Sequence, residues 1–260
     1  MKNILASLLF ITLAPPYVLH AQINPRHHAE RIHIDFKNTL YIPSRAKIIQ
    51  QTITFPVILI GAGLYAMTDN EVLNRYEIKE ERDEHSPTFR HHLDDYLQYS
   101  PIVAVYGLNA MGVNGQNNLA NRTALLIKSE MIMSVLTFSL KKLTAVPRPD
   151  TGEPTSFPSG HTAQAFAAAT FMVKEYGHKN VLYSISAYTV ATGIGVMRVM
   201  NNRHWASDVL AGAGIGILAT NLAYLTHRYN WGKHKTKSAS TIVLPSYDGQ
   251  TGMVNVMHRF

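Results

Sequence analysis

The chain has 260 residues, a formal net charge of +7 and no cysteine. The length suits one large domain or two small ones, and the absence of cysteine excludes a disulfide scaffold, Cys-ligated zinc and cysteine catalysis. The positive charge suits an anionic partner such as phosphate or a membrane surface, and the lack of interleaved basic and aromatic patches argues against nucleic acid. A mean hydropathy of −0.04 fits both a soluble helical protein and a membrane-attached one.

The first 21 residues have the pattern of a secretory signal peptide. Lys2 provides the positive region, an apolar stretch follows at 4–14, and Ala21 suits a cut before Gln22. We therefore expect residues 1–21 to be removed on export, with an uncleaved membrane anchor as the alternative. Residues 22–48 are polar and basic and are expected to form an N-terminal arm.

The middle of the chain predicts an all-α domain over residues 49–226. Apolar segments that suit helices in a bundle occur at 49–68, 99–113, 123–143, 162–173, 181–199 and 209–226. The last two are rich in small residues, which permit close helix packing. Residues 69–95 are rich in both charges and are expected to form a connector. These segments predict a helical bundle of about six helices.

The tail, residues 227–260, begins with a basic stretch and then changes character. Two apolar segments, 241–244 and 253–256, flank a turn-like sequence at 246–249. This pattern predicts a short C-terminal β-hairpin.

One stretch of the bundle has the features of an anion site. The sequence Pro158-Ser159-Gly160-His161 stands directly before an Ala-rich segment, which indicates a loop leading into a helix. The N-terminus of a helix offers free backbone N–H groups and the positive end of the helix dipole. We therefore expect an anion to bind there.

Two further groups of basic and acidic residues lie at helix ends. Lys141 is followed after six residues by Arg148-Pro149, and Arg198 precedes His204 and Asp208. An antiparallel pair of helices would bring the loops 143–157 and 200–207 to the same end of the bundle. The two groups would then meet the anion site.

The combined inventory suits phosphoryl transfer, which needs several fixed donors for the charge on three equatorial oxygens. Arginine can bind two oxygens with its planar fork, and lysine adds a point charge. The expected phosphate ligands are Lys141, Arg148, Ser159, Gly160 and Arg198.

Two histidines have the spacing and partners for covalent catalysis. His204 and Asp208 are four residues apart and share a face if a helix begins near Trp205. Asp208 would hold one ring nitrogen of His204 and leave the other as the nucleophile. His161 would protonate the leaving oxygen and later activate water. We expect no metal and no cofactor. A Ser159-His161-Asp208 triad would lack the Gly-x-Ser-x-Gly elbow.

The three groups, Lys-x6-Arg-Pro, Pro-Ser-Gly-His and Arg-x5-His-x3-Asp, resemble the signature of the type 2 phosphatidic acid phosphatase superfamily. That superfamily also contains bacterial non-specific acid phosphatases and vanadium haloperoxidases. The chain departs from the pattern at Met197, where the family usually has serine. The resemblance covers roughly residues 49–226 and implies a helical bundle and a phosphohistidine intermediate.

We expect a metal-independent lipid phosphatase, attached to the inner membrane with its site facing the periplasm. Its substrate would be lipid A, undecaprenyl pyrophosphate or phosphatidic acid. The alternatives are a soluble periplasmic non-specific acid phosphatase, a vanadate-dependent haloperoxidase, or a non-catalytic protein that binds lipid phosphates.

Overall fold

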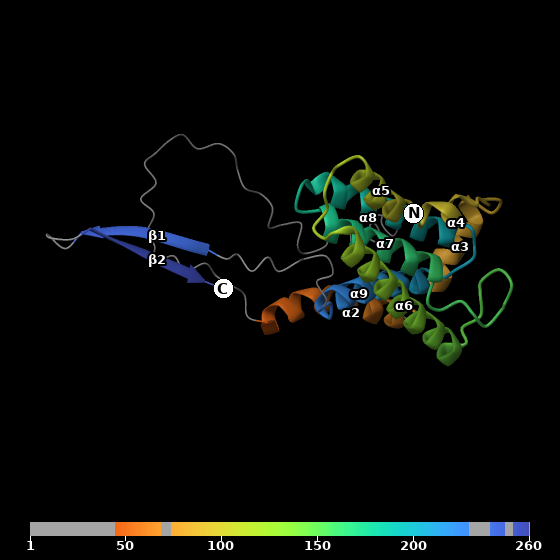
Figure 1. Cartoon of the computed structure of the whole chain (residues 1–260). Helices are drawn as coiled ribbons and strands as arrows, with labels where there is room; N and C mark the ends of the chain where they lie inside the picture. Colours follow the sequence, from red (N-terminus) through yellow and green to blue (C-terminus); the bar gives the residue numbers. More distant parts are fainter. Residues whose placement is uncertain (1–44, 69–73, 229–239, 248–251, 260) are drawn as a thin grey trace, which may run out of the picture.

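A computed structural model of the chain describes residues 45–68, 74–228, 240–247 and 252–259 (Figure 1). The expected signal peptide, the polar arm up to residue 44 and the basic stretch at 229–239 lie outside the described residues. Within the described part, eight helices and one two-stranded sheet are present. The all-α prediction for the central domain is confirmed.

All six expected segments are helical. The helices are α2 (Arg45–Tyr65), α3 (Arg75–His85), α4 (Leu93–Leu97), α5 (Ser100–Ala110), α6 (Leu119–Thr144), α7 (Gly160–Tyr176), α8 (Val181–Met200) and α9 (Ala206–Leu225). Two short helices account for the higher count, since α3 lies within the expected connector at 69–95 and α4 begins at its end. Asn74 caps α3 by accepting from the Tyr76 amide at 2.9 Å, and a capped helix can form without an apolar stripe.

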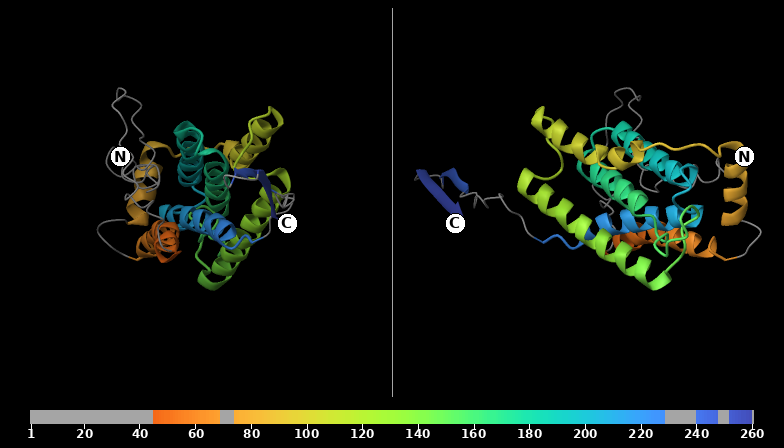
Figure 2. Two further views of the ribbon diagram at one scale, coloured as in Figure 1. Left: turned by 60° about the vertical axis from the view of Figure 1, so that its left-hand side comes forward. Right: turned by 90° about the vertical axis from the view of Figure 1, so that its right-hand side faces the viewer.

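Helix α9 lies at the centre of the bundle, between α2 and α7 (Figures 1 and 2). Its glycines allow the backbones to approach closely. A Cβ atom added at Gly214 would lie 2.6 Å from the carbonyl oxygen of Pro56 in α2, and one at Gly212 would lie 2.6 Å from that of Ser159. The small residues of α9 therefore fix its position against both neighbours.

The apolar core extends from α9 through α7 to α8 and α5. Its largest members are fully or almost fully buried, namely Phe166, Phe171, Tyr176, Tyr188, Ile194, Leu210 and Ile217. Helix α3 stands across one end of this bundle, as the right panel of Figure 2 shows. That end also holds the N-termini of α7 and α9.

Two of the described helices, α6 and α9, are long and apolar enough to cross a membrane. They differ in burial. Most of the apolar window of α9 is buried, as expected for a core helix, whereas only 22% of that of α6 is buried. Helix α6 thus presents a long apolar surface to the outside of the bundle.

The C-terminal hairpin is present. Strand β1 (Ser240–Tyr247) pairs antiparallel with β2 (Gly252–Arg259), and Tyr247 lies opposite Gly252. The strands are longer than the sequence indicates, so Ser246 and Tyr247 belong to β1 rather than to the turn.

Candidate active site

At the N-terminus of α7, the Ser159 hydroxyl and the Gly160 amide are available to bind an anion. Ser159 is the N-cap residue, and its Oγ accepts from the Thr162 amide at 3.4 Å and the Thr162 hydroxyl at 2.9 Å. Because Ser159 is the acceptor in both bonds, its own proton remains available to an oxyanion. A Cβ atom at Gly160 would meet only Thr137 Cγ2, at 4.0 Å, so the space beside this amide is open.

His204 lies in the loop before α9 and faces Asp208 in the first turn of that helix. Their Nδ1 and Oδ2 atoms are 3.3 Å apart, and the two residues are only 3% and 0% exposed. Asp208 Oδ2 also accepts from the Trp205 amide at 3.0 Å, which fixes the carboxylate at the helix start. A carboxylate on Nδ1 selects the tautomer whose Nε2 carries a free lone pair.

Hydrogen bonds join the His204–Asp208 pair to the loop before α7. The Ser156 hydroxyl donates to Asp208 Oδ2 at 2.5 Å, and the Ser159 amide donates to the Asp208 carbonyl at 3.0 Å. The Trp205 indole donates to the Pro147 carbonyl at 2.8 Å. The two loops therefore meet at one end of the bundle, as the sequence predicts. Ser156 was missed, because a single serine in a Pro-rich loop carries no pattern.

The first predicted basic group converges on the same loop. Lys141 Nζ, in the last turn of α6, donates to the carbonyl oxygens of Thr155 at 2.5 Å and Ser156 at 3.2 Å. Arg148 Nε donates to the Thr155 hydroxyl at 3.1 Å. Lys141 and Arg148 are thus held beside the residue that binds Asp208.

Burial and positive charge keep His204 neutral. Desolvation, followed by the charges of Arg198 and Lys141, lowers the pKa of His204 to about 4, although Asp208 acts in the opposite direction. A neutral imidazole at pH 7 has the lone pair that a nucleophile needs.

Arg198, in the last turn of α8, has a buried donor without an acceptor. Its Nη1 donates to Asp94 Oδ2 at 2.7 Å, and both side chains are buried. Its Nε atom is buried and, among the described residues, has no hydrogen-bond partner. Buried donors are nearly always paired in native proteins, so this atom suits a bound oxyanion.

His161 contacts a second carboxylate of α4. Its Nε2 lies 2.8 Å from Asp95 Oδ1, which also lies 3.7 Å from Arg198 Nη1. Burial and then the charge of Arg198 lower the pKa of His161, while Asp95 and Asp94 act to raise it. The His204 amide donates to the Arg198 carbonyl at 3.3 Å, and Asp95, which contacts His161, lies 3.7 Å from Arg198 Nη1, so the two histidines lie on either side of Arg198.

The sequence missed the role of Asp94 and Asp95, which it placed in a charged connector. The available signal was an acidic pair shortly before an apolar segment. Asn201 holds this part of the chain in place: its side-chain amide donates to the His91 carbonyl at 2.8 Å, and its Oδ1 accepts from the His91 amide at 2.9 Å.

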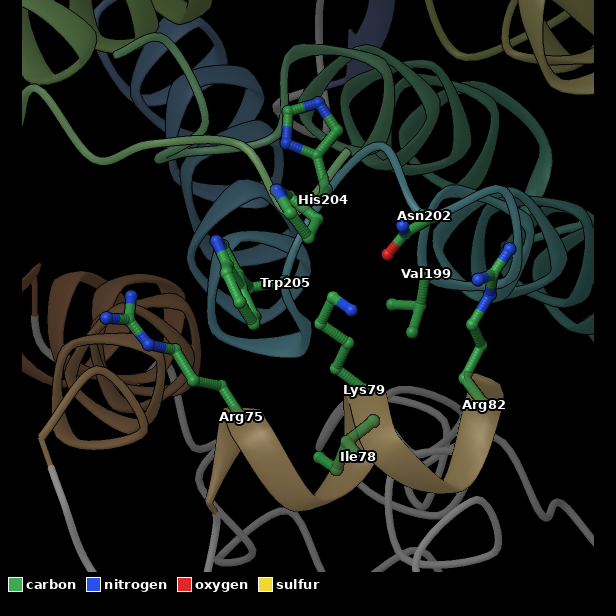
Figure 3. A pocket seen from close by; sticks show the side chains of 9 residues that line it. Arg75, Ile78, Lys79, Arg82, Val199, Asn202, His204 and Trp205 are labelled. Carbon is green, nitrogen blue, oxygen red and sulfur yellow. The ribbon is translucent and has the colours of Figure 1, made fainter. Parts of the chain in front are cut away.

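A small pocket lies behind the His204 loop, between that loop and α3. Figure 3 shows Arg75, Lys79 and Arg82 extending from α3 toward the loop, whereas the His204 ring points away from α3. Arg82 Nε donates to the Met200 carbonyl at 3.0 Å, and the Arg75 guanidinium lies 5.0 Å from the Trp205 ring. These contacts brace the loop from outside, and the sequence did not predict them.

Two other residues of the sequence analysis lie apart from this network. Arg203 is exposed and pairs with Asp150 at 3.1 Å. Met197, which replaces the expected serine, is half-buried. In the part of the chain that the structure describes, no group of three or more His, Asp or Glu side chains could hold a metal ion.

The chain resembles several known proteins. Residues 123–232 match the PAP2 superfamily. A lipid A 1-phosphatase from Porphyromonas gingivalis is 31% identical over 228 residues, which are 84% of this chain and 49% of that protein. The chain therefore spans about half the length of this relative.

Two solved structures are also similar. LpxE from Aquifex aeolicus has 24% identity and a TM-score of 0.44, covering 56% of this chain and 93% of its own. A transmembrane PAP2-type phosphatidylglycerolphosphate phosphatase from Bacillus subtilis has 19% identity and a TM-score of 0.43, covering 68% and 94%.

The matched range contains Lys141, Arg148, the Ser159–His161 helix start, Arg198, and the His204–Asp208 pair. All the residues that were expected to carry the chemistry thus fall inside it. The part of the chain that matches the PAP2 superfamily is therefore the part that holds the candidate site.

Proposed function

We propose that the protein is a phosphatase that removes phosphate from a lipid through a phosphohistidine on His204. The observation that carries the proposal is the buried His204, whose Nδ1 faces Asp208 while Arg198 nearby has an unpaired Nε donor. A nucleophile and an unpaired cationic donor for an oxyanion at one centre suit phosphoryl transfer. The match to the PAP2 superfamily and the similarity to a lipid A 1-phosphatase support it.

In the first step, the Nε2 lone pair of His204 attacks phosphorus and forms a P–N bond. The P–O bond to the lipid breaks, its electron pair stays on the leaving oxygen, and His161 gives that oxygen a proton. Asp208 stabilises the positive charge that develops on the His204 ring.

In the second step, His161 takes a proton from water as the water oxygen attacks phosphorus. The P–N bond breaks, its electron pair returns to Nε2, and inorganic phosphate leaves. Throughout both steps, Arg198, Arg148 and Lys141 hold the phosphoryl oxygens, and the Gly160 amide and Ser159 hydroxyl add uncharged donors.

We propose further that the enzyme works at a membrane, with α6 facing lipid. The exposed side chains Ile127, Met131, Val135 and Phe138 recur every three or four residues and form one apolar stripe, and each is more than half exposed. Glu130 instead accepts a hydrogen bond from Gln164 of α7 at 2.8 Å, so this charge faces the bundle. Export and a site on the periplasmic side belong to the same proposal.

Flotation with liposomes tests the membrane proposal. The double variant Met131→Lys, Val135→Lys should bind liposomes much more weakly than the wild type, because charged side chains are costly against lipid. Thr88→Lys, in an exposed loop, adds charge elsewhere and should float like the wild type. Equal flotation of all three proteins would contradict a lipid-facing α6.

Phosphate release from four substrates tests the activity. The full-length protein in detergent is offered lipid A, undecaprenyl pyrophosphate, phosphatidic acid and a water-soluble phosphate monoester. We expect release from at least one lipid well above the soluble monoester, and none from His204→Ala. His178→Ala, an exposed histidine between α7 and α8, is the matched control and should remain active.

Other outcomes separate the alternatives. Equal release from all four substrates would indicate a non-specific acid phosphatase. Binding of lipid phosphate without release by the wild type would indicate a binding protein, and halide oxidation that depends on added vanadate would indicate a haloperoxidase. Full activity of His204→Ala would exclude the phosphohistidine.

A further inference from the structure

Helix α4 brings a carboxylate into contact with the predicted general acid. Asp95 Oδ1 lies 2.8 Å from Nε2 of His161, although the two residues are 66 positions apart in the chain. Asp95 lies outside the three sequence motifs and outside the matched range 123–232. Its neighbour Asp94 is buried and binds Arg198, which anchors α4 against the site.

We propose that Asp95 is the positioning residue of the general acid, which orients the His161 ring and stabilises its protonated form. The inference rests on the proposed phosphatase function. With Nε2 directed at Asp95, Nδ1 is the ring nitrogen that exchanges a proton with the substrate.

The surrounding charges explain why His161 needs such a partner. Burial and the nearby Arg198 of α8 both disfavour the imidazolium, and Asp94 and Asp95 of α4 oppose them. His92 also approaches Asp95, with Nδ1 3.4 Å from Oδ2. A general acid must carry its proton when the P–O bond breaks. Without Asp95, a larger fraction of the enzyme would contain neutral His161. Such a ring need not carry a proton on Nδ1, the atom that donates to the substrate.

An alternative role for Asp95 is to occupy the phosphate site and compete with the substrate for Arg198. Asp95 Oδ1 lies 3.7 Å from Arg198 Nη1, so the carboxylate could compete with an oxyanion. Two observations favour positioning. The contact with His161 is much shorter, and the close partner of Arg198 is Asp94 rather than Asp95. Competition would make inorganic phosphate a stronger inhibitor of Asp95→Asn, whereas positioning would not.

The leaving group provides the decisive test. An aryl phosphate with an acidic phenol leaves with little help from an acid, whereas an alkyl phosphate needs protonation of its oxygen. For Asp95→Asn in detergent, we expect kcat on the alkyl phosphate to fall about 100-fold, within the range for loss of acid catalysis. On the aryl phosphate, kcat should fall only a few-fold. Asp150→Asn, which removes a carboxylate paired with the exposed Arg203, should change neither rate.

A double-mutant comparison separates positioning from a structural effect. If Asp95 acts through His161, then Asp95→Asn should cost no further activity in a His161→Asn background. Asp95→Glu, which keeps the carboxylate, should recover part of the alkyl-phosphate rate. Equal losses on both substrates, additive losses in the double variant, or tighter inhibition by phosphate would overturn the inference.

Failure of the proposed function has a different signature. In that case the wild type would release no phosphate from any substrate, or His204→Ala would remain fully active. Failure of the Asp95 inference alone leaves an active wild type and an inactive His204→Ala, with no dependence of the Asp95→Asn effect on the leaving group.

Discussion

Asp208 Oδ2 lies 3.3 Å from His204 Nδ1, and neither side chain is accessible to solvent to any useful extent. The same oxygen accepts from the Ser156 hydroxyl and the Trp205 amide. The carboxylate is therefore fixed before substrate arrives, and it fixes the ring in turn. Asp208 thus holds Nδ1 of His204 and leaves Nε2 as the nitrogen that reacts.

Asp208→Asn should lower kcat on the order of 10³-fold, because an amide can present its N–H₂ to the ring and favour the wrong tautomer. Ser156→Ala removes only a support of the carboxylate and should cost about 10-fold, as for other indirect ligand contacts. Phosphate release under saturating substrate measures both. Wild-type kcat in Asp208→Asn would contradict the assignment of His204 as the nucleophile.

The pH profile of kcat/KM should have an acidic optimum. His204 must be neutral to attack, and its pKa of about 4 sets the acidic limb. His161 must be protonated to act as the acid, and its pKa is held below the ordinary value of 6.5. Activity should therefore fall below about pH 4 and again before pH 6.5 is exceeded. A flat profile between pH 4 and pH 8 would contradict these roles.

The free energy of unfolding should also depend on pH between about 4 and 6.5, and it should rise with pH. Between pH 6.5 and about 4, the unfolded chain protonates His204 while the folded protein does not. Stability therefore rises with pH across this window and is lost as the pH falls. His204→Gln lacks this titration, so its unfolding midpoint should decline less on acidification than that of the wild type. Parallel curves for the two proteins would contradict the prediction.

Arg198→Lys should weaken phosphate binding at least 10-fold, since a lysine cannot reproduce a planar fork with several donors. The measurement is inhibition by inorganic phosphate. Arg203→Lys is the matched control, because Arg203 is exposed and pairs with Asp150. Inhibition that is equally weakened in both variants would contradict a specific phosphate contact by Arg198.

Two glycine substitutions test the packing of α9. A Cβ atom at Gly214 would lie 2.6 Å from the Pro56 carbonyl and 2.7 Å from Ile60 Cγ1. Gly214→Ala should destabilise the protein by about 1–3 kcal/mol, the usual cost of overpacking. Gly193 in α8 has nothing within 4 Å of such an atom, so Gly193→Ala should stabilise the fold by up to about 1 kcal/mol. Unfolding in detergent with denaturant measures both.

The sequence predicts the part of the site that lies at the ends of long apolar helices. Lys141, Ser159 and His204 each stand where such a segment starts or stops, and antiparallel packing then brings their loops together. The helices themselves were also predictable, because small and apolar residues dominate them. Their bounds differ by a few residues, since caps such as Ser159 decide the first turn.

The residues that support the site were not predictable. Helix α4 has five residues, too few for a helical period, and its acidic pair reads as a solvated turn. Only the fold shows that Asp94 and Asp95 face Arg198 and His161. Helix α3 is rich in charge and lacks an apolar stripe, so its position beside the His204 loop depends on contacts such as Arg82 with Met200.

The bond from the Ser159 amide to the Asp208 carbonyl connects the start of α7 to the start of α9. With Gly212 against the Ser159 carbonyl, the two helix starts behave as one rigid piece. A bulky substrate therefore cannot enter by separating them. The two helix starts are held in register by contacts of the backbone, so a substitution of the His161 or His204 side chain should leave their relative position unchanged.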